Sequence, residues 1–321
     1  MNPTVRTLLP RASLAALWLA SLLLPAFASA AGPSSHGLPS DLPPSVSPRQ
    51  LPADAPRLGA LALEWEAADA ARGKSPKGAP RCLPFQEAER LEYVLEWMGI
   101  DVGRAFFEVL PDGRFGRRDA WHFRMTARTT SWADRIYRVR DKLDGWANPR
   151  MDRAIGHEKI AREGSYHRDI KLDLDWRKRR VTYRNQWKAF PPKPLFADTW
   201  DPLGLLYAFR MRTIDAKGHH PMSVTDGLKT IRADVKVHGV ETIEVGGRKI
   251  EAWHVEPEMK DVGGVFERSP GARMHVWVSR DGRHLPLRLQ SKVMVGSFTA
   301  TLVKATGLAP DRAGCRLDTL R

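Results

Sequence analysis

The sequence predicts a mainly β fold, with a large curved antiparallel sheet or a partly closed β-barrel and one buried helix packed on it. Apolar and polar residues alternate with a period of two through much of residues 82–316, as in an antiparallel sheet with one packed face and one wet face. Asp-Gly and Gly-Gly pairs, which favour tight hairpins, separate the alternating runs. One segment breaks the alternation and has the composition of a buried helix.

The first 30 residues have the three parts of a secretory signal peptide. Arg6 and Arg11 precede an apolar run over residues 12–24, and an A-x-A cleavage pattern follows at residues 28–30. We therefore expect a signal peptide that is cleaved off and a periplasmic protein. No later run approaches the ~20 apolar residues of a membrane helix, so we expect no membrane span.

Residues 31–81 contain nine prolines and few large apolar side chains, which predicts a flexible leader. Within this leader, the Ala-rich residues 58–72 favour a short helix. We expect a single β domain over residues 82–316 and a tail over residues 317–321.

The chain is strongly basic. Its net charge is +14, and removal of the signal peptide takes away Arg6 and Arg11 and no acidic residue, which leaves 14 − 2 = +12. Such a balance suits anionic partners such as lipid or lipopolysaccharide, or it simply keeps the protein soluble. Because the protein is expected to be exported, nucleic acid is not an expected partner.

The strands are predicted from the runs in which alternation is clearest. These runs cover residues 91–97, 121–125, 170–176, 181–187, 285–289 and 298–302. Hairpin turns are predicted at Asp112-Gly113, Gly246-Gly247 and Asp281-Gly282. About ten to twelve strands are expected, with a short helix over residues 132–139.

The buried helix is predicted over residues 201–211. Asp201 is a favourable N-cap, and Pro202 suits the first helical position. Most of the following residues are apolar, so the helix should have little exposed surface.

A curved sheet over a buried helix encloses either a packed core or a ligand cavity, and the sequence leaves both open. The residues expected to line a cavity are Tyr93, Leu95, Trp97, Phe123, Leu174, Leu206, Tyr207 and Phe209. A basic run, Arg177, Lys178, Arg179 and Arg180, is either a solvated hairpin tip or a rim that contacts phosphate groups.

The two cysteines, Cys82 and Cys315, lie at the two ends of the predicted domain. In an oxidising compartment this placement favours a disulfide. Two buried thiols are the alternative, since neither cysteine has a nucleophile signature.

No motif identifies a catalytic or metal site. The sequence has no H-E-x-x-H, no cysteine cluster and no G-x-S-x-G element. We therefore assign no catalytic residue, metal ligand or cofactor, and the sequence leaves an enzymatic role open but less favoured.

Residues 83–109 resemble the opening of the bacterial domain-of-unknown-function family 3108. The residues that fit are Pro84, Phe85, Glu89, Leu91, Tyr93, Trp97, Gly99 and Gly103. Ala88 replaces the usual glycine. Residues 131–146, 200–210 and 276–302 look like later blocks of the family, so the resemblance covers about residues 82–305. It implies an exported envelope protein with a large antiparallel β structure, somewhat similar to lipoprotein carriers of the LolA and LolB type. It implies no catalytic residue.

Three functions remain open on this basis. The favoured one is non-catalytic binding or escort of an apolar or amphipathic envelope component, such as lipid or lipopolysaccharide. The alternatives are an enzyme acting on envelope polysaccharide or lipid, and a scaffold that binds another envelope protein through a sheet edge.

Overall fold

A single large sheet dominates the computed structural model, which describes residues 64–65, 75–80, 82–216, 218–258, 272–293 and 296–311. Within these ranges, twelve strands are six residues or longer. They are β2 (Arg90–Trp97), β3 (Ile100–Leu110), β6 (Trp121–Thr129), β7 (Arg140–Ala147), β8 (Ala154–Glu163), β9 (Tyr166–Asp175), β10 (Arg180–Asn185), β16 (Val235–Val245), β17 (Arg248–Pro257), β18 (Arg273–Ser279), β19 (Pro286–Val293) and β20 (Gly296–Thr306). The antiparallel class is confirmed, and these twelve long strands fall within the expected ten to twelve, while eight shorter strands in the same ranges were not expected.

Shorter strands extend the sheet or form small companions. They are β1 (Glu64–Trp65), β4 (Arg114–Phe115), β5 (Arg118–Asp119), β11 (Lys188–Ala189), β12 (Lys193–Pro194), β13 (Thr199–Trp200), β14 (Met222–Thr225) and β15 (Thr230–Ala233). Strands β13, β14 and β15 form a separate three-stranded sheet, and β4 pairs with β5.

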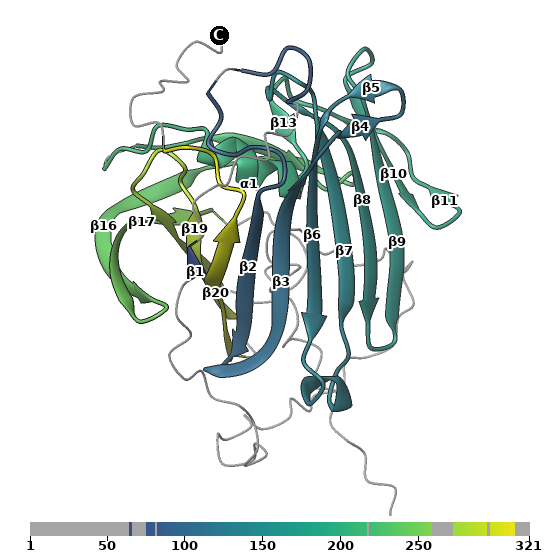
Figure 1. Ribbon diagram of the computed structural model, residues 1–321. Coiled ribbons are helices and arrows are strands. Elements are labelled where there is room, and N and C mark those ends of the chain that lie inside the picture. The colour runs from purple at the N-terminus through teal and green to yellow at the C-terminus, as the bar shows by residue number, and fades with distance from the viewer. Residues whose placement is uncertain are drawn as a thin grey trace, which may run out of the picture.

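The main sheet is open. Its order is β11-β10-β9-β8-β7-β6-β3-β2-β20-β19-β18-β17-β16, so β16 and the short strands beside β10 form its two edges (Figure 1). The chain reaches the second half of the sheet by pairing its last strand, β20, with its first long strand, β2. The structure is therefore a curved sheet rather than a closed barrel.

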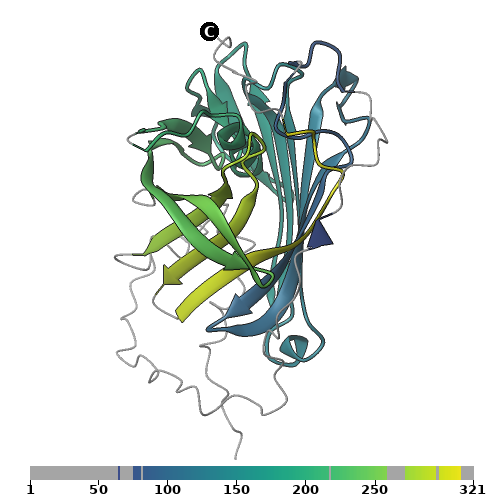
Figure 2. The ribbon, with the colours of Figure 1, turned by 60° about the vertical axis from the view of Figure 1, so that its left-hand side comes forward.

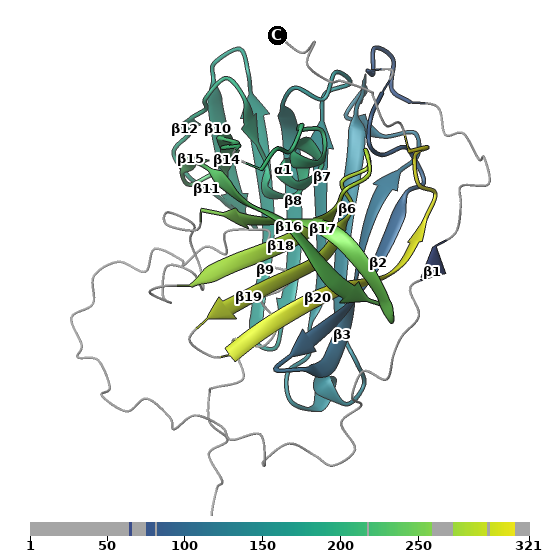
Figure 3. The ribbon, with the colours of Figure 1, turned by 90° about the vertical axis from the view of Figure 1, so that its left-hand side faces the viewer.

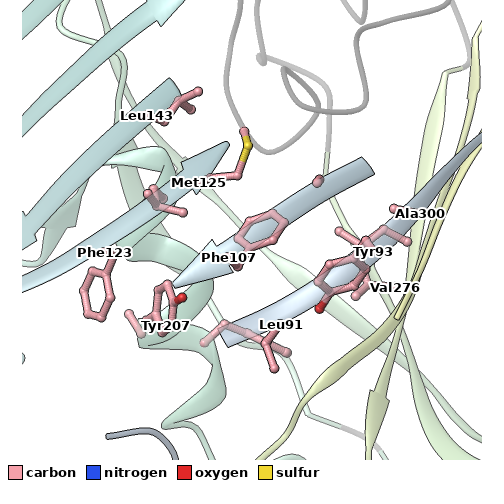
Figure 4. Close-up of a cluster of buried hydrophobic side chains, with 14 of the residues drawn as sticks. Leu91, Tyr93, Phe107, Phe123, Met125, Leu143, Tyr207, Val276 and Ala300 are labelled. Carbon is pink, nitrogen blue, oxygen red and sulfur yellow. The ribbon is translucent and has the colours of Figure 1, made fainter. Parts of the chain in front are cut away.

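The sheet bends so that its two halves face each other. Strands β18–β20 run across strands β6–β9 in the view of Figure 3, and the same crossing is seen obliquely in Figure 2. Side chains from β2, β3, β6 and β7 form one buried cluster with Val276 and Ala300 of the other half, and Tyr93 of β2 lies beside these two residues (Figure 4). The core lies between the halves, and we call the sheet face that lines it the concave face.

Helix α1 (Pro202–Arg210) packs on the concave face against β6 and β7. The Asp201 side chain accepts hydrogen bonds from the backbone N–H groups of Leu203 and Gly204, and Pro202 follows the cap. The predicted start signal is confirmed, and most of the helix is buried. No helix in the described part of the chain is long and apolar enough to cross a membrane.

Several local expectations differ from the structure. The run over 181–187 ends early, because β10 stops at Asn185 and Trp187 lies exposed in the following turn. Residues 132–139 hold only a 3₁₀ turn, η3 (Ala133–Arg135). The Ala-rich stretch was expected to form a short helix. Instead, its residues Glu64–Trp65 form a strand that pairs in parallel with the backbone of β20. The predicted signal peptide and the tail lie outside the described residues.

Candidate functional site on the concave face

The N-terminal end of α1 is fixed to the concave face by a buried polar contact. His157 of β8 and Gly145 of β7 are directly opposite each other in the sheet. The missing side chain of Gly145 leaves room for Asp201, because a Cβ there would lie 2.7 Å from Asp201 Oδ2. The same oxygen lies 2.9 Å from His157 Nδ1. Asp201 therefore both caps the helix and anchors it to the sheet.

The C-terminal end of α1 is fixed to the other half of the sheet. The fully buried Arg210 guanidinium forms a two-point ion pair with Glu89, with N–O distances of 2.6 and 2.9 Å. Arg210 also donates to the carbonyls of Pro84 and Arg283, and His284 Nδ1 donates to the Arg210 carbonyl. Each of the three guanidinium nitrogens therefore has at least one partner, as a buried charge requires.

The predicted cavity-lining residues come together, and they are closely packed. Tyr93, Leu95, Phe123, Leu174, Tyr207 and Phe209 are buried in one continuous cluster, while Trp97 and Leu206 are partly buried against it. The Phe123 and Tyr207 rings stack with centroids 3.9 Å apart, and Phe85 meets both edge-on. Next to α1, these aromatic side chains fill the interior.

Further from α1, the concave face carries a buried lysine. Lys159 of β8 lies directly opposite Leu143 of β7 and Ile170 of β9, and both of these residues belong to the core cluster. Lys159 is only 6% exposed. Within the described residues its ammonium group has no hydrogen bond or ion pair. Its Nζ is not among the buried unpaired side-chain atoms of the described residues, so the stem of Lys159 is buried while its ammonium group keeps contact with solvent. This position can therefore accept an anionic partner.

Other polar atoms on the same side also lack partners. Asp141 is a diagonal neighbour of Lys159, about 7–8 Å away by sheet geometry, and its Oδ2 is buried and unbonded. The Ser291 hydroxyl of β19 and the Tyr207 hydroxyl of α1 are also buried without a partner in the described structure. Buried polar atoms are rarely left unpaired, so the concave face has several atoms that are able to form hydrogen bonds with a ligand.

The predicted basic rim is exposed and lies away from Lys159. Residues 177–179 belong to the turn between β9 and β10, and Arg180 is the first residue of β10. Lys159 is level with Ile170, and the turn begins beyond Asp175, about 17 Å further along the strand. Trp176 donates to the Ala154 carbonyl, which places the turn at the α1 end of β8.

Sequence reasoning missed Lys159, although β8 carries a signal. Lys159 is buried while its neighbour Ile160 faces solvent. Alternation alone would place Ile160 inside and Lys159 outside. This inversion of apolar and charged residues in β8 becomes visible only when the register of the strand is known.

The sequence matches the model of a family described as "Protein of unknown function (DUF3108)" over residues 92–303. No curated protein matches the sequence. Among solved structures, the fold is similar to a β-barrel-like protein of family DUF1849 from Brucella abortus, with 10% identity and a TM-score of 0.46 over 71% of this chain and 100% of the other. It is also similar to a protein with a YmcC-like fold from Bacteroides fragilis NCTC 9343, with 8% identity and a TM-score of 0.32 over 70% and 97% of the two chains.

Proposed function

Since the chain belongs to the DUF3108 family of proteins of unknown function, whose description supplies no activity, we propose a function from its interior: it is a periplasmic, non-catalytic protein that binds an anionic amphiphile of the envelope. The apolar part of the ligand would lie against the concave face. Its anionic group would contact Lys159.

The observation that carries this proposal is Lys159, a largely buried side chain whose ammonium group has no hydrogen bond or ion pair within the described residues, beside the apolar core cluster of the concave face. Ligand sites are typically apolar with a few polar groups that fix orientation. A carboxylate or phosphate on Lys159 would form a charge-assisted hydrogen bond with its ammonium group. The free Asp141 oxygen and the Ser291 hydroxyl would suit hydroxyl groups of a headgroup.

The sequence supports the location and the charge of the ligand. The first 30 residues have the signal-peptide pattern, and the chain without them carries a net charge of +12, from 14 − 2. A positive field raises the local concentration of anionic ligands and speeds their association. The main insoluble cargo of the expected compartment is lipid.

The proposal is tested by titrating the mature protein with lipids and following tryptophan fluorescence. Trp121 and Trp200 are buried in the core cluster and act as reporters. Palmitate, phosphatidylglycerol and lipopolysaccharide are the anionic probes, and hexadecanol is the uncharged one. We expect saturable binding of at least one anionic probe and weaker binding of hexadecanol.

Two matched variants assign the binding to the concave face. Lys159→Met keeps the length of the side chain and removes the charge, and it should weaken anionic binding by about tenfold or more. Lys171→Met is the control, because Lys171 is an exposed residue of the adjacent strand β9. An absence of saturable binding to every probe, or equal losses in both variants, would refute the proposal.

A further inference from the structure

Three histidines gather on the face of the sheet opposite the concave face, near the edge formed by β16. His238 lies on β16, His254 on β17 and His275 on β18. His254 is directly opposite Trp277, and His275 precedes Trp277 by two residues. Val255 and Val276, the next residues along β17 and β18, belong to the core cluster. The alternation of a strand therefore places the histidines on the face opposite to these valines, together with the buried Trp277.

The ligand atoms of these histidines are close together. One ring nitrogen from each lies within 4.8 Å of the other two. The closest pair is His254 Nε2 and His275 Nδ1, which are 2.9 Å apart. A tetrahedral zinc site with Zn–N bonds of about 2.1 Å separates its nitrogens by about 3.4 Å. Side-chain movements of roughly an ångström would bring all three nitrogens to one ion.

Two carboxylates contact the imidazole rings of His254 and His238. Glu241 lies 2.7 Å from His254 Nδ1 and also accepts a hydrogen bond from the Trp277 indole. Glu256 lies 2.6 Å from His238 Nε2. These contacts direct His254 Nε2 and His238 Nδ1 toward the shared position, and an ion there would replace the hydrogen bond between His254 Nε2 and His275 Nδ1. A carboxylate on the second ring nitrogen is the usual outer contact of a metal-binding histidine.

Local backbone structure produces this arrangement. A β-bulge between Val237 and Gly239 places His238 as the extra residue of β16. The distal part of the β16–β17 hairpin then folds over the outside of β19, where Arg288 donates to the Glu244 carbonyl. The histidines lie on this outer face of the sheet, where His254 stacks on Trp277 with ring centroids 4.8 Å apart.

We propose that His238, His254 and His275 form a binding site for one late first-row transition-metal ion, Zn²⁺ or Cu²⁺. Imidazole nitrogens suit both ions, and three protein ligands leave a coordination position for water. The ion would join three adjacent strands and hold the β16 edge. This site is separate from the concave face, and it stands whether or not the protein binds an amphiphile.

Isothermal titration calorimetry tests the site with protein that carries no histidine tag and has been stripped with EDTA. Titration with ZnCl₂ and CuCl₂ should show one ion per chain, with micromolar or tighter affinity for at least one metal. His254→Ala and His275→Ala should each weaken binding at least tenfold. His167→Ala is the control, because His167 is an exposed histidine on β9, and its binding should match the parent.

Fluorescence gives a second readout that a folding defect would not imitate. Cu²⁺ bound at His254 should quench Trp277, so Trp277→Phe should lower the quenched fraction while keeping the stoichiometry. The melting temperatures of the histidine variants in EDTA should stay close to that of the parent, since none of the three histidines is fully buried. A parent protein without saturable binding, or unchanged binding in the His254→Ala/His275→Ala double variant, would overturn the proposal.

Discussion

Ala88 has a backbone conformation that suits glycine. Its φ is 66°, in the left-handed region where a Cβ is unfavourable. Ala88 lies in the turn that leads into β2, where its backbone N–H donates to the Val109 carbonyl. Family 3108 proteins are expected to have glycine at this position. The conformation is therefore kept by the surrounding structure despite its local cost.

Replacing Ala88 by glycine should stabilise the protein by about 1 kcal/mol, because glycine adopts this φ without strain. Urea unfolding measures the change. Ala189→Gly on the exposed strand β11 is the control, and it should be neutral or slightly destabilising. A loss of stability in Ala88→Gly would show that the left-handed turn carries no strain.

Asp226 gives the protein an identifiable pH dependence. Burial raises the pKa of Asp226 from 3.8 to about 6, against the opposing effect of the hydrogen bonds from the Lys229 and Leu228 backbone. The folded state therefore holds this proton more tightly than the unfolded state does. The resulting stability is full below about pH 4 and is lost as the pH rises to about 6, with a magnitude on the order of 3 kcal/mol.

Asp226→Asn should remove this dependence, because the amide is neutral and its oxygen still accepts the two backbone hydrogen bonds. The variant should be more stable than the parent at pH 8, by up to about 3 kcal/mol, and similar to it at pH 4. Asp175→Asn is the control, since Asp175 makes the same type of turn near the surface. A stability difference that is equal at both pH values would contradict this account.

At the level of elements, α1 connects the two halves of the sheet. Asp201 binds the helix to β8, and Arg210 binds it to Glu89 just before β2. The helix could be predicted because its start signal and apolar composition are local. The Glu89–Arg210 pair could not be predicted, because its members are 121 residues apart and nothing local marks them as partners.

Removing one member of the Glu89–Arg210 pair should be strongly destabilising. Glu89→Gln leaves the guanidinium buried without a countercharge and should cost about 3–5 kcal/mol. The double variant Glu89→Leu/Arg210→Met should recover much of this loss, because neither charge remains. The unfolding free energies of the single and double variants give the interaction energy between Glu89 and Arg210. Losses of stability that simply add would show that the two residues do not stabilise each other.

The candidate sites, too, depend on contacts between distant segments that the sequence could not predict. Alternation predicted the strands and five of the eight residues expected in the interior, and the apolar composition of the helix predicted the other three, since each follows from its own neighbours in sequence. Lys159 and the three histidines depend on the register between strands, and the cluster also depends on a bulge at His238. Residues 16 and 21 positions apart become neighbours only after β16, β17 and β18 are paired. The sequence therefore predicts faces, while the register decides which side chains meet.

At the level of the whole molecule, Cys82 and Cys315 are expected to join the two ends of the domain. Cys82 lies just before β2, and Cys315 lies outside the described residues, so the bridge stays a prediction. The chain-entropy model gives such a long loop at most about 5 kcal/mol. Thiol titration of the denatured, unreduced protein should find no free thiol. Two reactive thiols per chain would contradict the bridge.

The central claim is that the folded chain holds an anionic amphiphile at Lys159. Native mass spectrometry tests it on protein purified from the periplasm of an expressing bacterium. The parent and Lys171→Met should carry a discrete lipid adduct, which dissociates on activation to give an anion, and Lys159→Met should lack it. If the parent carries no adduct, or if all three proteins carry the same one, Lys159 does not anchor a ligand and the interior is only a packed core.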